Sequence, residues 1–249
     1  MFESRTRAAA AVMAGDVRLG TDGPRAQKPG QLVAEDAQLL VEDAPAFVSR
    51  GGLKLANALD ATGVDPAGRQ CLDAGASTGG FTDCLLQRGA GHVVCVDVGY
   101  GDLHWRLRGD ERVTVVERTN ARALAPGDLP YRPDLIVADL SFISLTKVLP
   151  ALAAVAAARF DALVMVKPQF EVGKGNVGKG GVVRSADDRR AALVAVASSA
   201  RELGCSVLGF ASSGLPGPRG NRETFLHLAH AGAGAGQMDL EAAAREVEP

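Results

Sequence analysis

An α/β fold with a seven-stranded, Rossmann-like sheet is the architecture that this 249-residue sequence predicts. From Arg69 onward, short apolar runs alternate with amphipathic stretches, a pattern typical of strands joined by helices. The first five runs are continuously apolar, which suits a parallel sheet buried on both faces. The last two runs are joined by the Gly/Pro-rich stretch 214–221, which has no room for a crossover helix, so these strands should pair antiparallel.

The individual elements follow from the same alternation along the chain. Strands are expected near residues 70–73, 92–97, 112–117, 134–139, 161–167, 205–211 and 222–229. Helices are expected near residues 80–88, 101–108, 144–158 and 185–203. Seven strands ending in an antiparallel hairpin describe the methyltransferase variant of the Rossmann-like sheet.

Four regions of the chain are predicted. Residues 1–45 combine an alanine-rich helix over 4–14 with short strand and turn segments, and they are too few for a robust core of their own. The other three regions are a linker and connector helix (46–62, helical from about 53 to 61), the α/β domain (63–230) and a flexible acidic tail (231–249), expected as a frayed helix or as disordered.

The composition is that of an ordinary soluble globular protein, with 47% apolar and 22% charged residues and a net charge of −2. The longest candidate for a membrane span, residues 148–158, is too short and contains Pro150. The N-terminus lacks the pattern of a signal peptide, so a cytoplasmic location is expected. The four cysteines have no CxxC spacing and are interpreted as reduced thiols, and no metal site is predicted.

The stretch 71–81 has the features of a nucleotide-binding turn. Asp73 ends an apolar strand, Gly75 permits a tight turn, and an amphipathic helix follows. Ser77 stands where a pyrophosphate would need a bare glycine, so the ligand should have no pyrophosphate there. The next strand ends in Asp97, a carboxylate suited to accept hydrogen bonds from two ribose hydroxyls. Together these features predict a site for S-adenosylmethionine.

Two more charged residues end strands of the predicted sheet, where ligands of parallel α/β proteins collect. Asp139 closes the fourth strand and Lys167 closes the fifth. Taken alone, Lys167 is also compatible with an ordinary solvated strand end, but a second charged end on the neighbouring strand favours a functional role. Lys54, on the connector helix, and Glu223, which opens the last strand, are by themselves more typical of ordinary surface positions.

The glycine-rich stretch 173–181 resembles a phosphate-binding loop without completing one. Gly178 and Lys179 fit that motif, but Gly180 stands where a Ser or Thr would hold magnesium. ATP binding is therefore not expected. A flexible basic loop that closes over a polyanionic substrate is the better interpretation.

Taken together, these stretches resemble the TlyA family of ribosomal RNA 2′-O-methyltransferases, whose catalytic domain is FtsJ-like. The resemblance covers about residues 3 to 230, and the family's S4-type N-terminal RNA-binding domain would be only partly present, starting near Glu3. The matching stretches are Ser49-Arg-Gly-Gly-Leu-Lys-Leu, Leu72-Asp-Ala-Gly-Ala-Ser-Thr-Gly-Gly-Phe-Thr, Asp97-Val-Gly-Tyr-Gly, Glu117-Arg-Thr-Asn-Ala-Arg, Ala138-Asp-Leu-Ser-Phe-Ile-Ser-Leu, Val166-Lys-Pro-Gln-Phe-Glu-Val-Gly-Lys and Leu215-Pro-Gly-Pro-Arg-Gly-Asn.

The resemblance implies methyl transfer from S-adenosylmethionine to a ribose 2′-hydroxyl of ribosomal RNA, with a cytidine as the family's target. The family's catalytic tetrad falls on Lys54, Asp139, Lys167 and Glu223. The residues expected to bind the cofactor are Asp73, Gly75, Ser77, Thr78, Gly79, Gly80, Asp97, Asn120 and Asp139. The residues expected to bind RNA are Arg5, Arg7, Arg50, Arg106, Arg108, Lys174, Lys179 and Arg219.

These roles lead to a mechanistic hypothesis. Lys167 takes the proton of the hydroxyl and can do so only when neutral, a state that a second ammonium at Lys54 and a partly dry site would favour. Asp139 holds Lys167, Lys54 positions the hydroxyl, and Glu223 orients both lysines. Three alternatives remain open from sequence: a non-catalytic ribosome-assembly factor that binds RNA, a methyltransferase of small molecules or proteins, and a haemolysin, although no pore-forming segment is evident.

Overall fold

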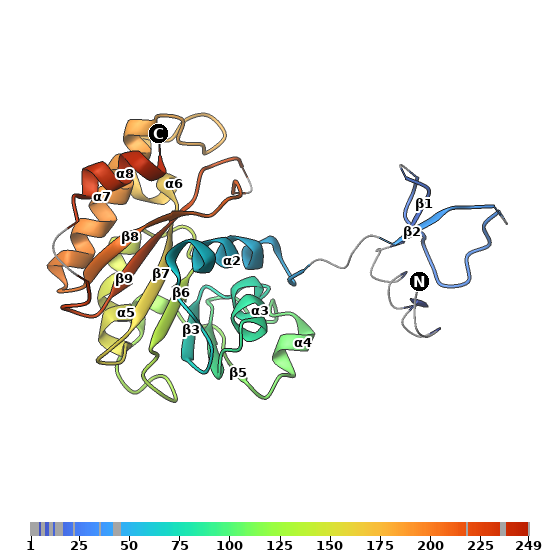
Figure 1. Ribbon diagram of the computed structural model, residues 1–249, viewed down its shortest axis with the longest axis horizontal. Coiled ribbons are helices and arrows are strands. Elements are labelled where there is room, and N and C mark those ends of the chain that lie inside the picture. The colour runs from blue at the N-terminus through green and yellow to red at the C-terminus, as the bar shows by residue number, and fades with distance from the viewer. Residues whose placement is uncertain are drawn as a thin grey trace. The chain divides into compact units, whose positions relative to one another are not determined.

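The computed structural model describes residues 5, 8, 9, 12, 17–21, 23–34, 36–41, 46–217, 219–234 and 238–248. The chain divides into two compact units, residues 1–46 and residues 47–249 (Figure 1). In the first unit, β1 (Val17–Leu19) pairs antiparallel with β2 (Leu39–Val41). The helix expected over 4–14 falls mainly outside the described residues, and so does the expected RNA-binding residue Arg7.

The second unit is built on a seven-stranded sheet with the order β5-β4-β3-β6-β7-β9-β8 (Figure 1). The strands from β5 to β7 are parallel, whereas β9 runs antiparallel to both β7 and β8. The predicted mostly parallel sheet with an antiparallel end is therefore confirmed. The strands are β3 (Gln70–Ala74), β4 (His92–Val96), β5 (Val113–Val116), β6 (Leu135–Ala138), β7 (Asp161–Val166), β8 (Ser206–Ser212) and β9 (Thr224–Ala229).

Alternate residues of each strand point to opposite faces of the sheet, so both faces of its apolar strands need cover, and helices pack on both. One core unites residues of α2 (Arg50–Thr62), α3 (Gly80–Gln87) and α4 (Trp105–Arg108) with strand residues such as Phe225. The opposite core unites α5 (Leu149–Val155), α7 (Ala186–Glu202) and α8 (Leu240–Val247) with Ile136 and its neighbours. Shorter turns of helix are η1 (Ala121–Ala123), η2 (Leu145–Lys147), α6 (Pro168–Glu171) and η3 (Lys174–Asn176). No helix among the described residues is long and apolar enough to cross a membrane.

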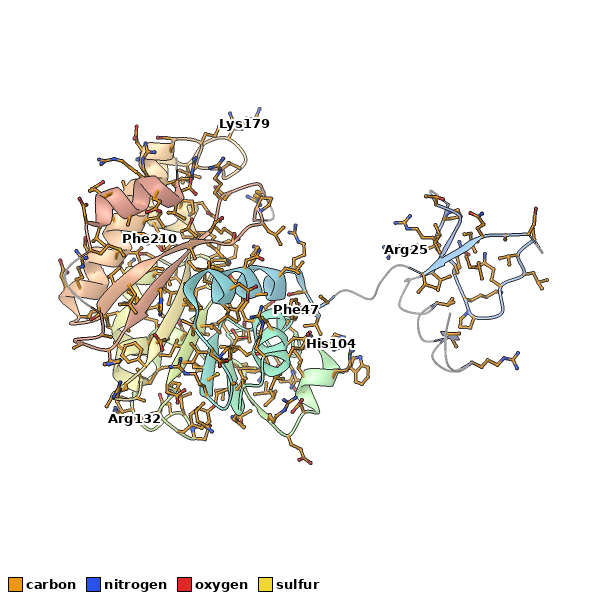
Figure 2. All side chains as sticks on the ribbon, in the orientation of Figure 1. Arg25, Phe47, His104, Arg132, Lys179 and Phe210 are labelled. Atoms are coloured by element: carbon orange, nitrogen blue, oxygen red, sulfur yellow. The ribbon has the colours of Figure 1, made fainter. Side chains whose placement is uncertain are left out.

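The predicted connector helix is longer than expected and belongs to the second unit. It starts at Arg50 because the Ser49 side chain caps it, accepting a hydrogen bond from Gly51 N at 3.3 Å. Position 52 is a glycine although it lies inside the helix, because any side chain there would clash with the side chain of Phe47. Figure 2 shows Phe47 at the start of α2. Leu55 is fully buried, so α2 is an integral layer of the fold and not a linker.

Two other expected helices are shorter than predicted. The stretch 101–108 is helical only from Trp105, because Gly101 has a φ of +81° and the His104 side chain caps the helix further along. The stretch 144–158 divides into η2 and α5, and Pro150 falls in the first turn of α5, where its missing N–H costs nothing.

The tail predicted for residues 231–249 does contain a helix, α8 at residues 240–247, but the prediction that it is frayed or flexible is wrong there. Asp239 caps this helix, and Leu240 and Ala244 are buried against the sheet's second core. The carboxylate of Glu248 is also buried and accepts a hydrogen bond from Arg189 Nε at 2.9 Å. The acidic residues that suggested a solvated tail therefore include a cap and a buried ion-pair partner.

Candidate active site at the carboxyl ends of the strands

The turn between β3 and α3 approaches the end of β6 more closely than any side chain would permit. Gly75 has a φ of +86°, and a Cβ at this position would lie 2.5 Å from the backbone oxygen of Asp139. Ser77, with a φ of +47°, also adopts the left-handed region, which is uncommon for a residue other than glycine. The turn therefore brings bare backbone to the edge of the sheet at which β3, β4 and β6 end.

A cavity of about 430 Å³ opens beside this turn, and we call it the first cavity. This volume is within the range of pockets that hold small ligands. Five of the residues predicted to bind the cofactor line it: Gly75, Ser77, Asp97, Asn120 and Asp139. The remaining lining residues are Val96, Val98, Thr119, Ala121, Leu140, Ser141, Phe142 and Ile143.

Asp97 is held in place by backbone donors. One carboxylate oxygen accepts from Ser77 N at 2.8 Å and the other from Gly99 N at 2.7 Å. Each oxygen still has acceptor capacity for a hydroxyl of a ligand in the first cavity. Asn120 lines the same cavity, and its side-chain oxygen accepts from Arg122 N at 3.0 Å. Asp97 and Asn120 can therefore contact the polar groups of a nucleoside bound in the first cavity.

Asp73 does not reach the first cavity, contrary to the predicted cofactor contact. Its side chain is fully buried, and Oδ2 accepts from the backbone N of Thr82 at 3.0 Å and from the Thr82 hydroxyl at 2.7 Å. Its Oδ1 has no hydrogen-bond partner in the part of the chain that the structure describes. Burial, together with the nearby carboxylates of Asp139 and Asp97, raises the pKa of Asp73 to about 7, although the Thr82 hydrogen bonds oppose the shift.

We expect the raised pKa of Asp73 to make the folded state less stable as the pH rises from about 4 to about 7. In this window the folded protein keeps a proton that the unfolded chain has released, so the stabilisation present below pH 4 is lost as the pH passes 7. At about 1.4 kcal/mol per pKa unit, the loss has an upper limit of roughly 4 kcal/mol. Chemical denaturation at several pH values should show a flatter profile for Asp73→Asn, whereas parallel profiles would contradict the assignment.

Two lysine–carboxylate pairs lie next to the first cavity. Lys54 of α2 forms a buried ion pair with Glu223, which directly precedes β9. Lys167, at the end of β7, lies 2.5 Å from Asp139 Oδ1 and donates to the hydroxyl of Ser141 at 3.0 Å. Asp139 therefore holds Lys167, as hypothesised. Glu223 was expected to orient both lysines, but its ion pair is with Lys54.

Each pair borders a further cavity that shares residues with the first. A second cavity of about 220 Å³ is lined by Lys54 and shares Gly75, Ser77 and Asp139 with the first. A third cavity of about 320 Å³ is lined by Lys167 and Glu223, and it shares Ser141 and Phe142 with the first. The catalytic residues predicted from four separate parts of the chain thus line neighbouring cavities with shared walls at one edge of the sheet.

The remaining residues predicted to bind the cofactor are Thr78, Gly79 and Gly80, and only two of them line a cavity. Thr78 and Gly80 line the second cavity. Gly79 lines neither the first nor the second. It has a φ of +97°, and a Cβ there would lie 2.3 Å from Leu107 Cδ1, so its small size serves the packing of α3 against α4.

The predicted RNA-binding residues differ in their exposure and in whether their side chains are already paired. Arg50 lines the second cavity and Arg219 the third, and both are exposed. Lys179 is exposed on the glycine-rich loop, where Figure 2 shows it at the outer edge. Arg108 is committed to an ion pair with Glu117, which makes it a poor phosphate ligand. Arg106 is exposed, Arg5 is exposed in the first unit, and the side chain of Lys174 falls outside the described part of the structure.

Sequence reasoning missed a set of neutral residues around the third cavity. Phe142 has a φ of +65° and a 91% exposed side chain, and its ring centroid lies 5.3 Å from that of Phe170. Gln169 and Asn221 line the same cavity. Most of these residues directly follow the ends of β6 and β7, so the strand-end rule that found Asp139 and Lys167 would have found them had it been extended beyond charged residues.

The sheet order, the glycine turn and the strand-end carboxylates define a methyltransferase-type α/β domain. Residues 47–230 match the model of the FtsJ-like methyltransferase family. A 16S/23S rRNA (cytidine-2′-O)-methyltransferase, TlyA of Mycobacterium tuberculosis, is 55% identical over 92% of this chain and 85% of its own length. A 23S rRNA (cytidine-2′-O)-methyltransferase TlyA of Campylobacter jejuni is 36% identical over 73% of this chain and 70% of its own.

The chain therefore belongs to the FtsJ-like methyltransferase family and, within it, to the TlyA group. A solved structure of a Streptococcus thermophilus protein that is named as a hemolysin matches 99% of this chain and 90% of its own chain, at 38% sequence identity and a TM-score of 0.77. The family match begins at residue 47, so the S4-like character of the first unit stays a prediction.

Proposed function

We propose that this protein transfers a methyl group from S-adenosylmethionine to the 2′-hydroxyl of a cytidine ribose in ribosomal RNA. The observation that carries the proposal is the convergence of Lys54, Asp139, Lys167 and Glu223 around two cavities that share lining residues with the first, nucleoside-sized cavity. The activities named for the TlyA relatives support the same reaction and the same class of substrate.

The residues around the first cavity fit the cofactor. Gly75 lets the turn pack against the backbone of Asp139 and so brings its own backbone to the wall of the cavity, and Asp97 offers carboxylate oxygens to the two hydroxyls of a ribose. Asn120 would lie at the nucleobase end, and Asp139 at the end nearest Lys167. When bound, S-adenosylmethionine would supply a methyl group already activated by a positively charged sulfur.

The chain's own task is then to position the ribose and accept one proton, because a 2′-hydroxyl is a poor nucleophile at neutral pH. Lys167, in its neutral amine form, is the proposed base, since it lines the third cavity and is fixed by Asp139 and Ser141. Lys54, fixed by Glu223, would hold the hydroxyl or the adjacent phosphate from the second cavity. Aligned acceptor and donor atoms remove much of the entropic part of the barrier.

The third cavity has the size and lining for the nucleobase of the target. Its aromatic pair, Phe142 and Phe170, can stack on a base that has been turned out of its helix. Arg219, which lines this cavity, and the exposed Lys179 of the glycine-rich loop can contact phosphates, which position the RNA without specifying its sequence. A ribosomal substrate would also place the working enzyme in the cytoplasm.

Mass spectrometry of ribosomal RNA nucleosides tests the proposal. We expect 2′-O-methylcytidine to appear when undermethylated ribosomal subunits are incubated with the protein and labelled S-adenosylmethionine. Label on a base, or on no nucleoside, would contradict it. Calorimetric titration with S-adenosylmethionine separates the enzyme from an assembly factor that keeps the fold without binding the cofactor.

A further inference from the structure

One neutral side chain of the third cavity has hydrogen-bonding capacity that the protein does not use. Gln169, in α6, lines this cavity but makes no hydrogen bond within the described part of the chain. Its Oε1 is buried and has no hydrogen-bond partner among the residues that the structure describes. A buried carbonyl oxygen of this kind costs about 1–3 kcal/mol, so a group that reached it on binding would recover that energy.

The other polar side chains of the cavity either have partners already or, in the case of Arg219, lack an acceptor. Lys167 is bound to Asp139 and Ser141, and Glu223 to Lys54. The Asn221 amide donates to Gly181 O at 2.8 Å and accepts from Val183 N at 2.9 Å, tying the glycine-rich loop to the 214–222 loop. Arg219 is a cation with donors only. Gln169 is therefore the neutral side chain left to meet a ligand that needs both a donor and an acceptor.

We infer that Gln169 reads the Watson–Crick edge of the target cytosine, an inference that rests on the proposed function. Cytosine presents an amino donor at N4 and an acceptor at N3, side by side. A primary amide is their complement, because Oε1 accepts from N4 while Nε2 donates to N3. The amide meets this edge by rotating toward the cavity it already lines, which also gives the orphaned oxygen a partner.

The position of Gln169 along the chain supports this assignment. Only Pro168 separates it from Lys167, the proposed base for the 2′-hydroxyl. In a nucleoside, the base and the 2′-hydroxyl are attached to adjacent ring carbons, so the groups that serve them must also be neighbours. Phe142 and Phe170 would contact the face of the base and Gln169 its edge, which assigns stacking and specificity to different side chains.

The test compares Gln169→Leu and Gln169→Glu with wild-type protein on ribosomal subunits, using 2′-O-methylcytidine formation as the readout. We expect kcat/KM for Gln169→Leu to fall about 10- to 100-fold, the usual value of a paired hydrogen-bond contact to a base edge. Gln169→Glu keeps an acceptor for N4 but loses the donor for N3, so its loss should be smaller. The dissociation constant of S-adenosylmethionine should stay at the wild-type value in both variants.

Subunits in which the mapped target cytidine is replaced by uridine provide the second readout. Wild-type protein should prefer cytidine, and Gln169→Leu should reduce that preference. Gln70→Leu, the same change at an exposed glutamine on the amino end of β3, is the matched control and should leave both readouts unchanged.

An unaltered kcat/KM and cytidine preference in Gln169→Leu would overturn the inference, and so would weakened cofactor binding in both variants, which would indicate a structural role. Failure of the wild-type protein to methylate ribose would instead overturn the proposed function itself.

Discussion

Replacing Lys167 with methionine should lower kcat about 10²- to 10⁴-fold, the usual contribution of a positioned general base, while S-adenosylmethionine binds as in the wild type. The reason is geometric. Lys167 is fixed by Asp139 and Ser141 at the border of the third cavity, and it is absent from the lining of the first, where the cofactor is proposed to bind. Single-turnover kinetics with saturating subunits measures the chemical step, and calorimetry measures the cofactor's dissociation constant.

Lys147→Met is the matched control, because Lys147 is an exposed lysine of η2 outside all three cavities. It should keep wild-type kinetics. Measurable turnover at the wild-type rate in Lys167→Met would refute the role of base. Loss of cofactor binding in the same variant would show that Lys167 acts mainly in the first cavity.

Replacing Glu223 with alanine should destabilise the fold by about 3–5 kcal/mol, because it leaves the buried ammonium of Lys54 without its partner. Both side chains of the pair are almost inaccessible to solvent, so water cannot compensate for the lost carboxylate. Chemical denaturation gives the free energy of unfolding. Arg88→Ala breaks an exposed ion pair with Asp60 and should cost less than about 1 kcal/mol.

The double variant Lys54→Met with Glu223→Leu separates stability from catalysis. Replacing a buried ion pair with apolar residues of similar size is often neutral or stabilising, so the double variant should recover most of the lost stability. It should nevertheless stay inactive, because the charge next to the second cavity is gone. A double variant that regains activity together with stability would show that the pair only supports the fold.

The sheet could be predicted from the sequence because its signal is local. Runs such as Leu135–Ala138 are apolar throughout, and the short loop between β8 and β9 leaves antiparallel pairing as the available solution. Helix ends were harder to predict from the sequence, since the position of an end depends on a single capping side chain. Ser49 starts α2 earlier than the apolar pattern suggests, and Asp239 caps a helix in a stretch that looked like an acidic tail.

The candidate site was predictable where a charged residue ends a strand. Lys54 and Glu223 gave no such signal, because their pairing joins positions far apart in the chain and became visible only through the family resemblance. The roles of Asp73 and Gln169 depend on burial and on which hydrogen bonds are missing, and neither property is written in the local sequence. Burial and hydrogen bonding both depend on how distant segments of the chain pack together.

The most direct test of the central claim is a crystal structure of the protein with S-adenosylmethionine. We expect density in the first cavity, with the ribose hydroxyls on the carboxylate of Asp97 and the methyl group directed toward Asp139 and Lys167. A cofactor bound elsewhere, or one whose methyl group points away from Lys167, would contradict it.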